Sequence, residues 1–264
     1  MTVADQLFTD AANLSVILLG IALLTGQLFR RKFAFQEAAP LGNVSVEEYR
    51  APELLIALGM IVIFYIKGTT AFSASWLTLL APILVLIHLG PIRSLPLLEH
   101  FGLDRKLDRP FLVRRILPMF GIVTAVTLLT MYLWQLWLTD LVGELPAQPG
   151  IQMLRDNPKN VGIWLALFIQ ACIFAPIAEE VLFRGFLYPV LKRFVQPFAA
   201  AVVVAGIFAI AHPVNAASLA PLFVLGILLV ICYEWTGTLW APILVHFGFN
   251  AFNLVYTFAS VNAG

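Results

Sequence analysis

The sequence IFAPIAEEVLFRGFL, residues 173–187, places two adjacent carboxylates and an arginine inside an otherwise apolar stretch. A charged side chain at the centre of a membrane helix costs about 2.5–3.5 kcal/mol on insertion scales. Such groups need partners, and within membranes they commonly mark a functional site. Glu179, Glu180 and Arg184 are therefore the first candidate functional residues of this chain.

The composition of the whole chain indicates an integral membrane protein. Of its 264 residues, 61% are hydrophobic and 12% are charged, whereas about 25% of residues are charged in soluble domains. The net charge of +1 and the lack of a long basic run argue against a nucleic-acid partner. Cys172 and Cys232 both lie in apolar stretches, so we interpret them as small core residues rather than as a disulfide or metal ligands.

The hydropathy pattern predicts an all-α, polytopic membrane bundle of about eight transmembrane helices. A bilayer core about 30 Å thick requires about 20 mostly apolar residues in each helix. The expected helices lie at about 11–29, 53–67, 74–92, 116–139, 161–194, 197–213, 217–234 and 239–260. We divide the chain into N-terminal transmembrane helices, 1–160, and a second helical region, 161–264. The first ten residues contain no lysine or arginine, so we expect the first apolar stretch to be a spanning helix rather than a cleaved signal peptide.

The distribution of basic residues predicts the orientation of these helices. With both termini outside, three basic residues face outward, Lys67, Arg155 and Lys159. The inner side then receives Arg30, Arg31, Lys32, Arg50, Arg93, Arg105, Lys106, Arg109, Arg114, Arg115, Lys192 and Arg193. Because basic loops remain on the cytoplasmic side, this bias places both termini outside and residues 99–115 at the inner interface.

Residue counts place Glu179 and His212 at the same depth. Fifteen positions separate Glu179 from Phe194, and fifteen separate Pro197 from His212. At a rise of 1.5 Å per residue, both side chains lie about 22 Å from the inner surface. A short turn joins the two helices, so they should be antiparallel neighbours. Pro176 predicts a kink or break close to the acidic pair.

Helical spacing then predicts which side chains lie next to the charged groups. Glu180 and Arg184 form an i,i+4 pair, as do His246 and Asn250, so the members of each pair lie on one face of their helix. Glu179 is rotated about 100° from Glu180. We therefore expect Glu180 to be held by Arg184 and Glu179 to point toward His212.

These residue types together can hydrolyse an amide bond. A carboxylate and an imidazole that share a water can remove its proton and direct it at a carbonyl carbon. A second imidazole N–H and an amide N–H, such as those of His246 and Asn250, can stabilise the resulting oxyanion. No serine or threonine accompanies the cluster, and Cys172 lies nearly two turns before Glu179. A covalent nucleophile is therefore not indicated.

Other interpretations remain open at this stage. Glu180 and Arg184 can form a purely structural ion pair, and Phe208 is most simply a packing residue. Glu179, His212 and His246 are three possible zinc ligands of a membrane hydrolase, although no HExxH pattern accompanies them. The cluster can also be a proton relay in a transporter, although the chain shows no convincing internal repeat.

The remaining histidines, His88 and His100, lack such company, and we assign them no role.

Three motifs give the chain a resemblance to a known family. Residues 179–184 match EExxxR, residues 208–212 match FxxxH, and residues 246–250 match HxxxN. In this order they resemble the CAAX protease and bacteriocin-processing (CPBP) family of intramembrane glutamic endopeptidases, which includes the Ras-converting CAAX prenyl proteases. The resemblance covers about 165–258, so it makes 161–264 the catalytic region.

The resemblance implies a glutamate-dependent peptidase that uses neither a metal nor another cofactor. The implied roles are water activation by Glu179 with His212, oxyanion stabilisation by His246 with Asn250, and orientation of the site by Glu180, Arg184 and Phe208. It also implies a prokaryotic cell membrane, with membrane lipids around the chain and a site that opens toward the inner side.

The implied substrate is a peptide or protein. CAAX-type members remove three residues after a prenylated cysteine, and the need for prenylation and the oligomeric state stay open. Some relatives act in bacteriocin immunity or as scaffolds without proteolysis, so a non-proteolytic membrane scaffold is the alternative function.

Overall fold

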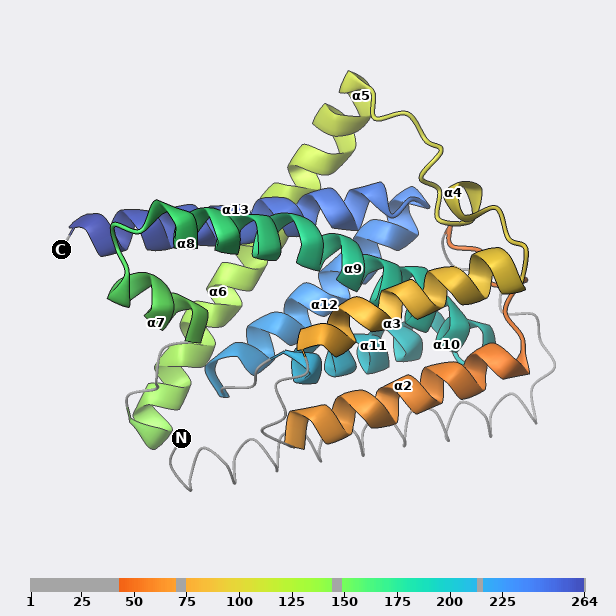
Figure 1. Cartoon of the computed structure of the whole chain (residues 1–264), viewed down its shortest axis with the longest axis horizontal. Helices are drawn as coiled ribbons and strands as arrows, with labels where there is room; N and C mark the ends of the chain where they lie inside the picture. Colours follow the sequence, from red (N-terminus) through yellow and green to blue (C-terminus); the bar gives the residue numbers. More distant parts are fainter. Residues whose placement is uncertain (1–42, 70–74, 144–148, 213–215, 264) are drawn as a thin grey trace.

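The computed structural model describes residues 43–69, 75–143, 149–212 and 216–263, and within them every regular element is helical (Figure 1). The first half contains α2, Ala51–Thr69; α3, Ser75–Ile87, which continues into the π-helical segment η1, His88–Ile92; and α4, Leu97–His100. Next come α5, Arg109–Phe111; η2, Leu112–Ile116; α6, Leu117–Val142; and α7, Pro149–Asp156.

The second half begins with one long helix made of five segments. These are α8, Val161–Phe168; η3, Ile169–Phe174; α9, Ala175–Leu182; η4, Phe183–Leu187; and α10, Tyr188–Phe194. It is followed by α11, Pro197–Ala211; α12, Ala216–Thr236; and α13, Trp240–Ala263.

These helices confirm the predicted fold class. Within the described residues, four helical stretches are long and apolar enough to cross a membrane: Arg109–Val142, Val161–Phe194, Ala216–Thr236 and Trp240–Ser260. Shorter apolar helices supply the other expected positions in the described part, whereas the expected helix at 11–29 lies outside it. The total of eight spans therefore stays a prediction.

Two connections contain more helix than we expected. The stretch expected at 116–139 already begins at Arg109, because Asp108 accepts a hydrogen bond from the amide of Phe111 (2.8 Å) and Pro110 occupies the first turn. The polar connection 140–160 also contains the short helix α7.

The long helix continues through Pro176 and does not break there. The helix runs unbroken from Val161 to Phe194, with π-helical segments on both sides of α9. In this helix a proline lies two positions after the end of each π segment, Pro176 after η3 and Pro189 after η4. Since proline has no N–H, the wider π turn accommodates its ring and leaves nearby carbonyls for other partners.

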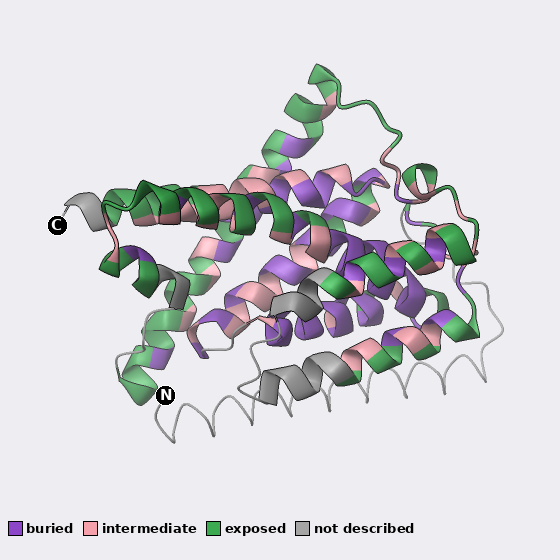
Figure 2. Cartoon of the chain, viewed as in Figure 1, coloured by how far each residue is buried: buried purple, intermediate pink, exposed green. Residues whose placement is uncertain are grey.

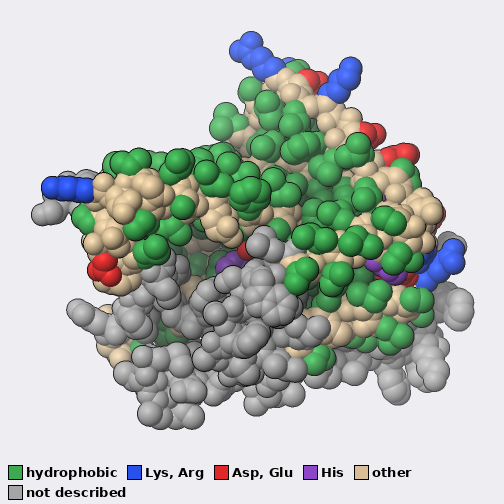
Figure 3. Space-filling view, in the orientation of Figure 1, with side chains coloured by type: hydrophobic (Ala, Val, Ile, Leu, Met, Phe, Trp, Pro, Cys, Tyr) green, Lys and Arg blue, Asp and Glu red, His purple; other side chains and the backbone are tan. Residues whose placement is uncertain are grey.

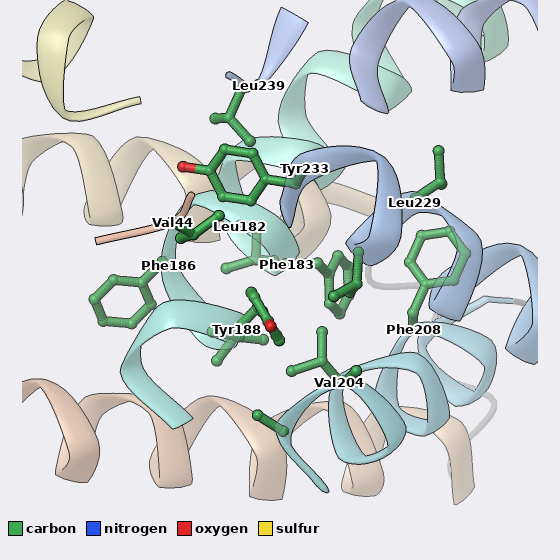
Figure 4. Packing of buried hydrophobic residues seen from close by; sticks show 14 of the residues in the cluster. Val44, Leu182, Phe183, Phe186, Tyr188, Val204, Phe208, Leu229, Tyr233 and Leu239 are labelled. Carbon is green, nitrogen blue, oxygen red and sulfur yellow. The ribbon is translucent and has the colours of Figure 1, made fainter. Parts of the chain in front are cut away.

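The core lies where the end of this long helix packs against α11 and α12. Figure 2 shows buried residues concentrated in α10, α11 and α12, whereas the outer faces of α6 and α8 are exposed. Figure 4 shows Phe183, Phe208 and Leu229 meeting from η4, α11 and α12. Small residues let these helices approach closely, because a Cβ on Gly226 of α12 would lie 2.9 Å from the Cα of Ala205 on α11.

We predict that Gly226→Leu destabilises the protein by about 1–3 kcal/mol, because its side chain has to separate α11 from α12. Thermal unfolding of the purified protein in detergent measures this loss. Gly121→Leu is the control, since nothing lies within 4 Å of a Cβ at that position. Equal unfolding midpoints for the two variants would contradict the close packing.

Candidate active site

The end of α11 positions His212 outside the helix. His212 is the C-cap residue, with an extended backbone (φ −78°, ψ 158°), and Pro213 follows it in the sequence. The residue before a proline is disfavoured in helical conformation, which explains why the helix ends here. The His212 Nδ1–H donates to the carbonyl oxygen of Phe208 (2.7 Å), one of the carbonyls left unpaired at the helix end. Its Nε2 therefore carries the lone pair in the neutral ring.

Glu179 faces two imidazole rings. Its Oε2 lies 3.7 Å from Nε2 of His212 and 3.9 Å from Nε2 of His246. Both distances exceed a direct hydrogen bond, and a water can bridge groups at such separations. The Glu179 side chain is 14% exposed and that of His212 is 26% exposed, whereas the Oε2 atom of Glu179 is itself buried and has no hydrogen-bond partner among the described residues. Figure 3 shows an imidazole and a carboxylate in a recess of this face of the molecule.

Glu180 lies deeper and makes different contacts. Its Oε1 accepts hydrogen bonds from Nη1 of Arg184 (3.0 Å) and from Nδ1 of His246 (2.9 Å). Glu180 and Arg184 have no exposed side-chain surface, and His246 has 3%. The sequence predicted the pair with Arg184, whereas it did not predict that His246 bonds to the same carboxylate.

Phe208 packs against Arg184 and against the imidazole rings of His212 and His246. The Arg184 guanidinium lies 4.6 Å above its ring, and the ring of His212 also lies 4.6 Å away. The ring of His246 is 5.9 Å away at an edge-on angle. Nη2 of Arg184 donates a hydrogen bond to the carbonyl oxygen of Gly226 (3.0 Å). One buried aromatic ring thus contacts both imidazoles and the arginine, and a cation–π contact stabilises that arginine.

Asn250 lies one turn after His246 and contacts the long helix. Its amide nitrogen donates to the carbonyl of Ala171 (2.8 Å) in η3. Pro176, five residues later, lacks the N–H that a π-helical bond to this carbonyl requires. One N–H of Asn250 therefore holds α13 against the long helix. Its expected part in oxyanion stabilisation stays a prediction that rests on the second N–H.

Tyr49 and His100 support the site from outside, and the sequence analysis missed both. The Tyr49 hydroxyl donates to the carbonyl of Gly185 (2.8 Å) and accepts from Nε2 of His100 (2.8 Å). Pro189, four residues after Gly185, lacks the N–H that would otherwise pair with this carbonyl. A proline four positions after a helical glycine was therefore the available signal. This contact fixes the backbone next to Arg184.

A second polar cluster anchors the start of α2. Glu53 is 1% exposed and accepts from His88 (3.1 Å), from the Arg93 guanidinium and from the backbone N–H of Arg50 (2.8 Å). His88, which had no predicted role, is thus a structural partner of a buried carboxylate.

The possible zinc site gains no support from the geometry. Within the described part of the chain, no group of three histidine, cysteine or acidic side chains is arranged to hold a metal ion. Cys172 and Cys232 are buried free thiols.

The protein is a helical membrane protein with a buried cluster of carboxylates and imidazoles. Comparison with protein families shows that residues 161–252 match the type II CAAX prenyl endopeptidase family, Rce1-like. This range contains all three motifs. Residues 161–252 are thus similar to an Rce1-like domain, in agreement with the resemblance that the motifs gave. Comparisons with curated proteins and with solved structures gave no match.

We predict that Arg184→Met lowers the free energy of unfolding by about 3–5 kcal/mol, because it leaves the Glu180 carboxylate buried without its cation. Denaturant unfolding in detergent measures the change. Arg155→Met, at an exposed position, is the matched control and should have little effect. Similar losses in the two variants would show that the buried ion pair is not required.

The contact between Tyr49 and His100 predicts a dependence of stability on pH. Burial lowers the pKa of His100 from its ordinary value of 6.5 and raises the pKa of Tyr49 well above its usual range. Below pH 6.5 the unfolded chain binds a proton at His100 that the folded chain binds only at lower pH. The free energy of unfolding should therefore fall as the pH decreases below this value, with a slope of at most about 1.4 kcal/mol per pH unit.

His100→Gln should lack this component, and unfolding of both proteins between pH 7.5 and 5 measures the difference. Identical pH dependence in wild type and His100→Gln would contradict the assignment.

Proposed function

We propose that the protein is an intramembrane endopeptidase that cleaves a peptide bond by direct attack of water. The observation that carries this proposal is the position of Glu179, whose Oε2 faces Nε2 of both His212 and His246 at 3.7 and 3.9 Å. The match of residues 161–252 to CAAX prenyl endopeptidases supports the same reaction class.

Glu179 and His212 activate the water in this mechanism. Because Nδ1 of His212 donates to the Phe208 carbonyl, its Nε2 accepts a hydrogen bond. A water between the two groups donates one proton toward Glu179 and the other toward His212. Its lone pair then points at the substrate carbonyl carbon, and proton removal accompanies formation of the carbon–oxygen bond.

His246 stabilises the oxyanion that forms. The Nδ1–H of His246 bonds to Glu180, so its Nε2 faces the site and donates to the oxyanion when it carries a proton. The second N–H of Asn250 is the further donor. The carbon–nitrogen bond then breaks, and the proton taken from water passes to the leaving amine.

The substrate we propose is a CAAX-type peptide whose lipid lies in the membrane beside the long helix. Apolar side chains close to Glu179 in the sequence face outward: Phe174 is 55% exposed and Ile177 is 46% exposed. An apolar surface beside the site suits a substrate that arrives through the bilayer with a hydrocarbon chain.

The test is mass-spectrometric detection of cleavage in a panel of peptides. The panel contains prenylated CAAX peptides, their unprenylated twins and unrelated apolar peptides. Glu179→Ala should reduce the rate by a factor of about 10²–10⁴, because it removes the general base. Glu99→Ala, which changes an exposed carboxylate, is the control and should retain the wild-type rate.

Cleavage of the prenylated peptides alone would identify the lipid as part of the recognised substrate. Unchanged cleavage by Glu179→Ala would contradict the proposed mechanism. If no peptide is cleaved, an in-cell phenotype that survives Glu179→Gln would favour the non-proteolytic scaffold.

A further inference from the structure

A polar cavity of about 540 Å³ lies at one end of the bundle, away from the carboxylate–imidazole cluster. Its walls come from the segment between α4 and α6 and from the turn between α12 and α13 (Figure 1). The lining includes the side chains of Asp104, Arg105, Phe111, Arg115 and Trp235. The proposed peptidase uses none of them.

The cavity is built on a tight backbone contact between its two walls. The amide of Leu239 donates to the carbonyl of Phe101 (2.9 Å), and the indole of Trp240 donates to the carbonyl of Leu103 (3.1 Å). Gly102 lies between them with a positive φ of 64°, and a Cβ there would be 2.3 Å from the carbonyl oxygen of Gly237. Only glycine allows this approach. The two walls are therefore held in a defined arrangement.

Two guanidinium groups line the cavity, and an aromatic ring supports each of them. The Arg105 guanidinium lies 5.2 Å from the centre of the Phe111 ring and donates to the carbonyl of Thr236 (2.8 Å). The Arg115 guanidinium lies 4.8 Å from the Trp235 ring. Among the residues that the structure describes, neither arginine has a carboxylate within 4.0 Å. With Asp104 included, these side chains carry a net charge of +1.

The cavity lies at the ends of membrane-length helices, where a membrane surface is expected. It adjoins the start of the membrane-length stretch Arg109–Val142, the end of α12 and the beginning of α13. Figure 3 shows basic side chains projecting at this end, where Figure 1 places α5. Tryptophan is enriched at such interfaces.

We propose that this cavity binds the phosphodiester group of an anionic phospholipid. A phosphate accepts paired hydrogen bonds from a guanidinium fork, and its single negative charge matches the +1 of the cavity. Basic pockets between membrane helices are typical sites for anionic headgroups. The position of the cavity at the ends of membrane-length helices favours a lipid over a free phosphate ion, because the acyl chains can then lie beside these apolar helices.

Native mass spectrometry of the purified, delipidated full-length protein tests this proposal. The protein is titrated separately with phosphatidylglycerol and phosphatidylcholine, and inorganic phosphate is added as a competitor. We expect one phosphatidylglycerol to bind preferentially and Arg115→Ala to weaken its binding at least about tenfold, through loss of a charge-assisted contact. Arg114→Ala is the matched control, since this exposed neighbour does not line the cavity, and it should change binding less than about twofold.

Arg115→Lys keeps the charge but loses the fork, so its affinity should lie between those of wild type and Arg115→Ala. Equal binding of both lipids, or equal effects of Arg114→Ala and Arg115→Ala, would overturn the proposal. Binding of inorganic phosphate without binding of phosphatidylglycerol would also overturn it, because the occupant would then be a soluble anion. Thermal unfolding of each variant confirms that a loss of binding is not a loss of fold.

Discussion

The buried carboxylate of Glu180 connects the helices that form the candidate site. It bonds to Arg184 on its own helix and to His246 on α13. Arg184 reaches the Gly226 carbonyl of α12 and lies on the Phe208 ring of α11. Each of these charges is costly in an apolar surrounding unless its partner is in place. The same contacts orient His246, so the interaction that neutralises the core also directs an imidazole toward Glu179.

Two prolines in the long helix leave backbone carbonyls free to accept hydrogen bonds from distant side chains. Pro176 and Pro189 cannot donate hydrogen bonds, and the π segments beside them leave carbonyls that other parts of the chain use. The side-chain amide of Asn250 donates a hydrogen bond to the carbonyl of Ala171, and the Tyr49 hydroxyl donates one to the carbonyl of Gly185. The irregular helix is therefore held at both ends of α9 by side chains from distant segments, which limits the movement of Glu179 and Glu180.

Much of the site could be predicted because helical geometry is local. The i,i+4 spacing predicted the contact between Glu180 and Arg184, and equal residue counts predicted that Glu179 and His212 lie close together. The contact of His246 with Glu180 depends on how α13 is rotated against α9, which spacing within one helix does not determine. The roles of Tyr49 and His100 depend on two separate segments, one before α2 and one at the end of α4, and Tyr49 contacts Gly185 of η4 across 136 residues of sequence. Such tertiary contacts leave only indirect signals, such as the position of Pro189.

The attack of an activated water on the substrate carbonyl is the central claim, and isotope labelling tests it most directly. A prenylated peptide is cleaved in ¹⁸O-labelled water with the enzyme in excess, so that each molecule turns over once. The account predicts ¹⁸O in the new carboxyl group of the product after this first turnover and none in Glu179, because no covalent intermediate forms. An unlabelled product together with ¹⁸O in Glu179 would contradict it, since that result identifies the glutamate as the nucleophile.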